Sequence, residues 1–86
     1  MNDRERYEER NQPSAVECRD GMLWVTLKDG RVIGTPLEWY PRLRDAVPEQ
    51  LAHVELMADG VHWPDLDEDL SVMAMVNGYR PPANPR

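Results

Sequence analysis

Polar and apolar positions alternate in short runs between residues 15 and 36, and Asp-Gly pairs separate these runs. In residues 22–28, MLWVTLK, every second position is Leu or Val, which places those side chains on one face of a strand. Asp20-Gly21 and Asp29-Gly30 bracket the run. Asp-Gly is favoured in hairpin turns because both central residues of a type I′ turn need a positive φ. With AVECR before it and RVIGT after it, the pattern predicts a three-stranded antiparallel meander.

Prolines interrupt a helical pattern over residues 35–53. Thr35 and Glu38 have the spacing of a capping box, and Pro36 stands where a first helical residue tolerates proline. Two later prolines, at positions 41 and 48, limit the length of any helix. Short helices are therefore predicted over 36–46 and 48–53, covering one sheet face with Leu37, Leu43, Val47 and Leu51.

The last third of the chain predicts a second hairpin and a terminal helix. HVELM (53–57) and VHW (61–63) flank another Asp-Gly pair, and VMAMVN (72–77) lies between Ser71 and Gly78. Serine is a good helix N-cap, and glycine accepts the left-handed residue that ends many helices. The expected fold class is α+β: a small antiparallel sheet, made of a three-stranded meander plus a short hairpin, with short helices packed on one face.

The chain length allows one domain, with 86 residues in all. The opening MNDRERYEERNQ is almost wholly polar and the closing YRPPANPR holds three prolines, so residues 1–12 and 81–86 are expected to be tails around a domain at 13–80. A domain this small buries a modest share of its surface. Dimerisation would add buried area, so a homodimer is a hypothesis that rests on size.

Composition excludes several classes of protein. The single cysteine, Cys18, cannot form an internal disulfide, which excludes a disulfide-stapled miniprotein. No apolar run approaches the ~20 residues of a membrane helix, and the charged N-terminus lacks the apolar stretch of a secretory signal. A cytoplasmic protein without membrane association is expected.

Charge divides the chain more sharply than its net value of −6 suggests. Between Arg44 and Arg80 there is no lysine or arginine, while the same interval holds Asp45, Glu49, Glu55, Asp59, Asp65, Asp67, Glu68 and Asp69. Affinity for nucleic acid comes largely from cations that replace condensed counterions. Direct nucleic-acid binding is therefore not expected. The expected partner is a basic protein.

The order of DGR (29–31), PLEWYPRL (36–43) and GVHWPDLDEDLSV (60–72), followed by Gly78, resembles the bacterial domain-of-unknown-function family 2442 in its stand-alone form. The resemblance spans residues 15–78 and implies an α+β fold of bacterial or phage origin. Some members of that family precede a helix-turn-helix segment, and others are predicted partners in toxin–antitoxin-like gene pairs. The resemblance implies no catalytic residues. The fused form is not expected here, because nothing after Gly78 could build a DNA-reading helix.

The acidic stretch HWPDLDEDLS (62–71) has two interpretations. Asp65, Asp67 and Asp69 alternate like the start of a calcium loop. Leu70 stands where that loop needs glycine, however, and Val76 where it needs glutamate. The favoured interpretation is a helix entry, because acids favour the positive N-terminal end of a helix. The charge would remain available to a basic partner.

The two histidines offer an alternative chemistry. His53 and His62 would approach one another if they lay on paired strands, and with Asp65, Asp67 and Asp69 they could build a metal- or ligand-binding site. The simpler expectation for His62, between Val61 and Trp63, is a half-buried structural side chain. The sequence has no nucleophile elbow, phosphate-cradling glycine loop or paired-cysteine motif, so neither an enzyme nor a cofactor is expected.

Two further residues are candidates for partner binding. Trp24 projects opposite its leucine and valine neighbours, so it belongs either to a second packed layer or to an exposed interface. Arg42 lies on a short predicted helix, and both an ion pair with a later acid and a role in binding stay open.

The favoured function is a non-enzymatic protein-interaction module, antitoxin-like or inhibitor-like, that presents an acidic surface to a basic partner. The predicted partner-binding residues are Asp65, Asp67, Glu68, Asp69, Trp24 and Arg42. Alternatives are the metal- or ligand-binding domain above and a sensory partner of a transcription regulator.

Overall fold

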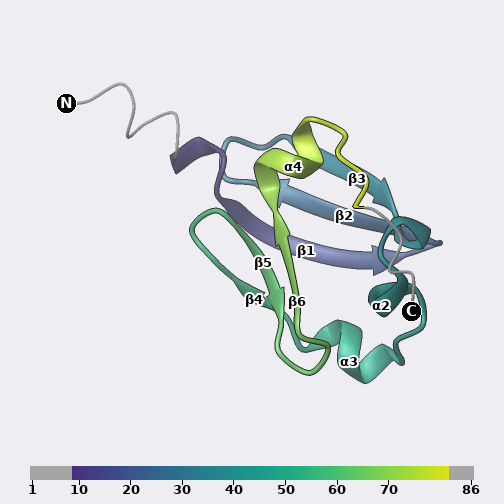
Figure 1. Ribbon diagram of the computed structural model, residues 1–86. Coiled ribbons are helices and arrows are strands. Elements are labelled where there is room, and N and C mark those ends of the chain that lie inside the picture. Colours follow the sequence, from purple (N-terminus) through teal and green to yellow (C-terminus); the bar gives the residue numbers. More distant parts are fainter. Residues whose placement is uncertain (1–8, 82–86) are drawn as a thin grey trace.

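A computed structural model describes residues 9–81 and shows two three-stranded antiparallel sheets with short helices between and beside them (Figure 1). Sheet A comprises β1 (Pro13–Arg19), β2 (Met22–Leu27) and β3 (Val32–Pro36), in the order β1-β2-β3. Sheet B comprises β4 (Glu55–Leu56), β5 (Gly60–Trp63) and β6 (Glu68–Ser71), in the order β4-β5-β6. The α+β class predicted from the sequence is confirmed.

The predicted meander is sheet A. Val25 of β2 pairs with Val16 of β1 and Ile33 of β3, so the alternation of apolar residues runs in register across the sheet. The β1–β2 turn has positive φ at both Asp20 and Gly21, 54° and 75°, as a type I′ turn requires.

The β2–β3 turn is built differently from the β1–β2 turn. Among its residues only Gly30 has a positive φ, at 96°. The Asp29 carboxylate instead accepts bonds from the backbone N–H and the guanidinium of Arg31.

Sheet B corrects the interpretation of the acidic stretch as a helix entry. Residues 64–67 form the β5–β6 turn, and Glu68–Ser71 is a strand that pairs with β5. Leu70, 7% exposed, points into the core between the exposed Asp69 and Ser71, which is the period of a strand. The pairing surface of β5 decides this conformation, because it offers four residues of ladder and a site for Leu70.

One core joins both sheets and the helices. Its buried apolar residues come from β2 and β5 and from the segments that follow them: Leu23, Val25, Leu27, Tyr40, Leu43, Val61, Trp63, Leu70, Val72 and Met75. Trp63 is fully buried, and its indole N–H donates to the Leu51 carbonyl oxygen at 3.0 Å. This bond ties α3 to sheet B.

The segment after β3 departs from the predicted helix over 36–46. It is divided into the 3₁₀ helix η1 (Leu37–Trp39) and α2 (Pro41–Arg44), which Tyr40 separates in an extended conformation. Thr35 is not a helix cap: it lies in β3, is 4% exposed, and accepts a hydrogen bond from the Tyr40 hydroxyl at 3.2 Å. Burial in the sheet leaves its hydroxyl no access to a helix end.

The helix predicted after Pro48 forms at the expected place, but the residue before it does not pack as expected. α3 (Pro48–Ala52) begins at its proline. Val47, expected to cover a sheet face, is instead 51% exposed because it lies outside α3 in an extended conformation.

The terminal helix α4 (Val72–Val76) has both of its predicted ends. The Ser71 hydroxyl accepts a bond from the Ala74 N–H at 3.2 Å. Gly78 follows the other end of the helix with φ 73°. The N–H groups of Gly78 and Tyr79 donate to the carbonyl oxygens of Met75 and Ala74, near the end of the helix.

Of the predicted tails, residues 1–8 and 82–86 lie outside the described residues. The described part shows contacts ahead of Pro13: Asn11 is 8% exposed, and the Gln12 carbonyl accepts a hydrogen bond from the Lys28 N–H.

Candidate interaction surface

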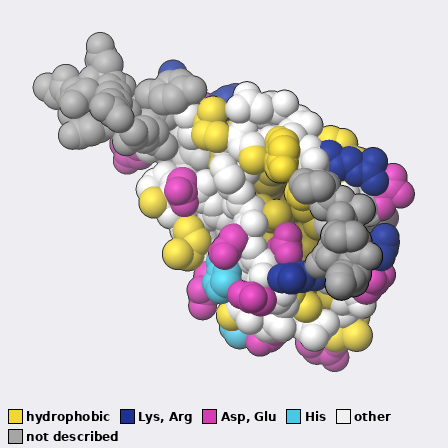
Figure 2. All heavy atoms as spheres, in the orientation of Figure 1, with side chains coloured by type: hydrophobic (Ala, Val, Ile, Leu, Met, Phe, Trp, Pro, Cys, Tyr) yellow, Lys and Arg dark blue, Asp and Glu magenta, His cyan; other side chains and the backbone are white. Residues whose placement is uncertain are grey.

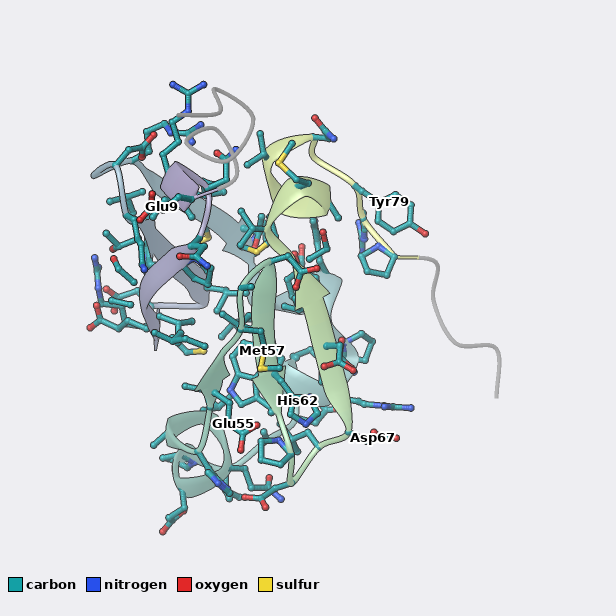
Figure 3. The ribbon with its side chains drawn as sticks, turned by 90° about the vertical axis from the view of Figure 1, so that its left-hand side faces the viewer. Glu9, Glu55, Met57, His62, Asp67 and Tyr79 are labelled. Atoms are coloured by element: carbon teal, nitrogen blue, oxygen red, sulfur yellow. The ribbon has the colours of Figure 1, made fainter. Side chains whose placement is uncertain are left out.

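The outer face of sheet B carries a row of three ionisable side chains, one from each strand. Register places His62 of β5 between Glu55 of β4 and Asp69 of β6. Because side chains alternate along a strand, burial of Val61 and Trp63 sends His62 outward. Figure 3 shows Glu55 and His62 on neighbouring strands, with Met57 beside them.

His62 is hydrogen-bonded across the strand pair. Its Nδ1 lies 2.6 Å from an Asp69 carboxylate oxygen. The His62 side chain is 25% exposed and that of Asp69 is 79% exposed. The histidine is half-buried, as expected from its place between two apolar residues, and the carboxylate reaches into solvent.

His53 pairs with a different carboxylate. It follows α3 directly, and its Nδ1 lies 2.9 Å from a carboxylate oxygen of Asp65 in the β5–β6 turn. The bond to Asp65 and the charge of that carboxylate raise the pKa of His53, and Glu55 adds to the effect. The two histidines do not lie on paired strands, because His53 precedes β4 and Glu55 takes the position opposite His62.

We call the set formed by His53, Glu55, His62, Asp65, Asp67 and Asp69 the carboxylate–histidine face. Figure 2 shows acidic side chains gathered around histidine on one side of the molecule. The carboxylate–histidine face holds four acids and two histidines, and the described residues pair none of these acids with lysine or arginine. The face is therefore negative.

Asp67 shapes the turn that carries this face. It has φ 52°, in the left-handed region that Asp tolerates better than most residues. The Arg42 guanidinium donates to the Asp67 carbonyl oxygen at 2.7 Å and reaches the Leu66 carbonyl oxygen at 3.4 Å. Arg42 thus joins α2 to the β5–β6 turn and positions it.

Glu68 differs from the other predicted acids. It is opposite Trp63 in the ladder, on the inward side of the strand, and its side chain is 19% exposed. Burial raises the pKa of Glu68, while Arg42, 3.9 Å away, lowers it. Glu68 therefore contributes to the packing of the turn more than to an exposed charge.

Trp24 lies apart from the acids. It is half-buried on the outer face of sheet A, where its ring covers Gly34 and the Arg19 guanidinium lies 5.1 Å from the ring centroid. The structure thus brings the predicted acids and Arg42 together around the β5–β6 turn and places Trp24 on a different sheet.

Three residues of this region were not predicted as site residues. Glu55 completes the row on sheet B, and Leu56 and Met57 beside it are 45% and 49% exposed. The signal for Glu55 was the HVELM strand pattern, but its partner His62 is identified only by the register of the hairpin.

The metal-binding alternative finds no built site in residues 9–81. These residues contain no group of three or more His, Cys, Asp or Glu side chains arranged to hold an ion. Each histidine instead bonds one carboxylate of its own.

Comparison with known protein families assigns the chain to one of them. The profile described as a protein of unknown function, DUF2442, matches residues 13–81. The chain belongs to the DUF2442 family. No curated protein matches it. Among the described residues, no helix is both long enough and apolar enough to cross a membrane.

Two solved structures resemble this DUF2442 domain. The solution NMR structure of an uncharacterized protein from Chromobacterium violaceum has a TM-score of 0.71 and 24% sequence identity, covering 96% of this chain and 87% of that one. The crystal structure of a protein of unknown function from Rhodospirillum rubrum ATCC 11170 has a TM-score of 0.70 and 25% identity, covering 83% of this chain and 90% of that one. The similarity concerns the fold.

Proposed function

We propose that this DUF2442 domain is a non-enzymatic protein-interaction module, antitoxin-like or inhibitor-like, whose carboxylate–histidine face binds a basic partner protein. The observation that carries the proposal is the grouping of exposed carboxylates on the outer face of sheet B and in the adjoining β5–β6 turn, within a stretch from Asp45 to Tyr79 that holds no lysine or arginine.

Charge and apolar area lie together on this face. Asp65 and Asp69 expose 47% and 79% of their side chains. Met57, which is 49% exposed, adds apolar surface beside Glu55 and His62 (Figure 3). Interfaces combine an apolar contact with polar groups at the rim, and complementary charge accelerates encounter. A cationic protein surface with an apolar centre fits this arrangement.

The partner itself is proposed to be basic, and a nucleic-acid-binding protein is one such partner. If that partner is a DNA-binding transcription regulator, this domain would act as its sensory partner. Direct contact of this face with a phosphate backbone is disfavoured, because like charges repel.

The experiment compares two variants of equal net charge. One reverses three acids of the face, Asp65→Lys, Asp67→Lys and Asp69→Lys. The control reverses three acids elsewhere, Glu17→Lys, Asp20→Lys and Glu49→Lys. Tagged full-length chains are used to capture proteins from a bacterial lysate, and the retained proteins are identified by mass spectrometry.

A basic protein should be retained by the unmodified chain and by the control, and lost with the face variant. Retention should also weaken as salt rises, since the screening length falls from about 10 Å at 0.1 M to about 3 Å at 1 M. The proposal fails if no basic protein is retained or if the two variants lose it equally. Calorimetry with zinc, calcium and manganese tests the metal-binding alternative: binding lost on His62→Ala would favour it.

A further inference from the structure

The outer edge of β3 has unpaired backbone groups. Two hydrogen bonds fix which residues face β2: Leu27 N–H donates to the Arg31 carbonyl at 2.8 Å, and Leu37 N–H to the Gly21 carbonyl at 2.9 Å. In an antiparallel ladder, alternate residues face the same neighbour. Arg31, Ile33, Thr35 and Leu37 therefore face β2, and Val32, Gly34 and Pro36 face away from it.

No hydrogen bond within residues 9–81 reaches those outward groups. The N–H and C=O of Val32 and Gly34 and the C=O of Pro36 lack partners in the described part of the chain. β3 is the edge of sheet A farthest from sheet B, because β1 at the other edge packs against β4 and β5 (Figure 1). Natural edge strands are blocked by short length, charge, proline, a bulge or a covering element. Between Val32 and Pro36 there is no charged residue, and the proline stands at the last position of the strand.

We infer that this edge pairs with the β3 edge of a second copy of the chain, antiparallel and centred on Gly34. In that register Gly34 faces Gly34 of the second copy, and the two exchange both of their backbone hydrogen bonds. Val32 faces Pro36 of the second copy, so each Val32 N–H donates to a proline carbonyl. The reciprocal bond, from Pro36 to the Val32 carbonyl, does not form because proline has no N–H. The edge is thus complementary to itself.

Trp24 lies where it would contribute to this dimer. A Cβ on Gly34 would lie 2.5 Å from the Trp24 ring, so the ring extends from β2 across β3 at the centre of the pairing. Paired Cα atoms across a hydrogen-bonded antiparallel pair are about 5.5 Å apart. The Trp24 rings of the two copies would then approach within the roughly 4.5–7 Å of aromatic contacts.

Apolar exposure and charge favour the same pairing. Val32 is 56% exposed, and α4, which packs against β3, exposes Met73 and Val76 by 39% and 40%. The carboxylate–histidine face lies on sheet B, beyond β1. Pairing through β3 places the two acidic faces at opposite ends of the dimer, where repulsion between chains of net charge −6 is small.

The test measures the mass of the full chain by sedimentation velocity and light scattering, at concentrations up to about 1 mM. The unmodified chain should form a dimer. Val32→Pro removes the outward N–H at the first residue of the strand and leaves the β2–β3 ladder intact. Loss of two interchain hydrogen bonds should weaken the dimer about 30-fold.

Val32→Lys provides a second variant that keeps the backbone and places charge on the edge, and it should yield a monomer. Val47→Lys is the matched control, because Val47 is 51% exposed on another part of the surface. It should remain a dimer. Circular dichroism checks that each variant is folded.

Hydrogen exchange of the Gly34 amide gives a readout without mutation. Its protection should rise with protein concentration as dimers form. The inference is overturned by a monomer at every concentration, by a dimer that both Val32 variants leave unchanged, or by a Gly34 amide whose protection is independent of concentration. None of these results depends on a basic partner, so the proposed function stands or fails separately.

Discussion

The inner faces of the two sheets are alike, whereas their outer faces differ. β2 contributes Leu23 and Val25 to the core, and β5 contributes Val61 and Trp63, all of them at most 1% exposed. On the outside, sheet A carries the Trp24 ring over Gly34, while sheet B carries His62 between the carboxylates of Glu55 and Asp69. The same alternation of side chains thus builds one shared core and two chemically distinct surfaces.

This difference separates stability from recognition in the molecule. Removing an inward side chain of either sheet affects the whole core, because that core is continuous. Changing an outward side chain affects one surface. The following predictions test that separation, beginning with the largest expected effect.

Trp63→Ala should lower the free energy of unfolding by about 3–5 kcal/mol, because it leaves a cavity where the two sheets and α3 meet. Trp24→Ala removes the same side chain from the outer face of sheet A and should cost only about 1–2 kcal/mol. Urea denaturation measures both. Equal losses would show that the outer face of sheet A is part of the core.

Trp63→Phe refines this result. It retains most of the buried ring volume but leaves the Leu51 carbonyl without the indole donor. The expected loss is about 1–3 kcal/mol, below that of Trp63→Ala.

Gly60→Ala should cost about 1–3 kcal/mol of unfolding free energy, because the new Cβ would collide with the Leu70 carbonyl oxygen in the β6 backbone. Gly34→Ala also creates a collision, but with the Trp24 side chain, which can rotate away. It should therefore cost less in the same urea experiment. A larger loss at Gly34 would mean that the Trp24 ring is held as firmly as a strand backbone.

The smallest expected effect concerns the protonation of His53, which lies between α3 and β4 and pairs with Asp65 of the β5–β6 turn. The Asp65 carboxylate raises the pKa of His53 above its usual value near 6.5. Asp65→Asn should lower that pKa toward the usual value, and Asp67→Asn is the control that leaves the His53–Asp65 bond in place. NMR titration of the imidazole measures the pKa in each chain.

The direction of the effect on stability follows from the raised pKa. The contribution of the His53–Asp65 pair is complete below the pKa of the unfolded state and disappears as the pH rises through the folded-state pKa. The unmodified chain should thus gain stability relative to Asp65→Asn when the pH falls from 8 toward 6. A gain in the opposite direction would contradict the pairing.

Local signals predicted those elements whose ends and periodicity lie close together in the sequence. The meander follows from alternation around Asp20-Gly21, and α4 follows from Ser71 and Gly78. β6 was not predicted, because EDLS ahead of an apolar helix has the composition of a helix entry. Thr35 has the spacing of a cap, but its strand buries it.

The candidate site was predicted in composition but not in arrangement. Asp65 and Asp69 were expected on an exposed acidic surface. Their histidine partners are 12 and 7 residues away in the chain, and no local pattern specifies those pairs. For Arg42, an ion pair with a later acid and a role in binding were both left open. It lies 3.9 Å from the Glu68 carboxylate, but its shortest contact is the Asp67 carbonyl oxygen at 2.7 Å, which has no sequence signature.

By itself, the sequence determined the meander, the terminal helix, the excess of carboxylates after Arg44 and the membership of the chain in its family. These properties depend on neighbouring residues or on composition. Tertiary structure decided that EDLS is a strand, that Glu68 turns inward while Asp69 turns outward, and that each histidine bonds a particular carboxylate. The strand, the two orientations and the His62–Asp69 bond depend on the register of β5 against its two neighbours, since a shift of one residue would exchange the buried and exposed faces of the strand. The His53–Asp65 bond depends on where the end of α3 meets the β5–β6 turn.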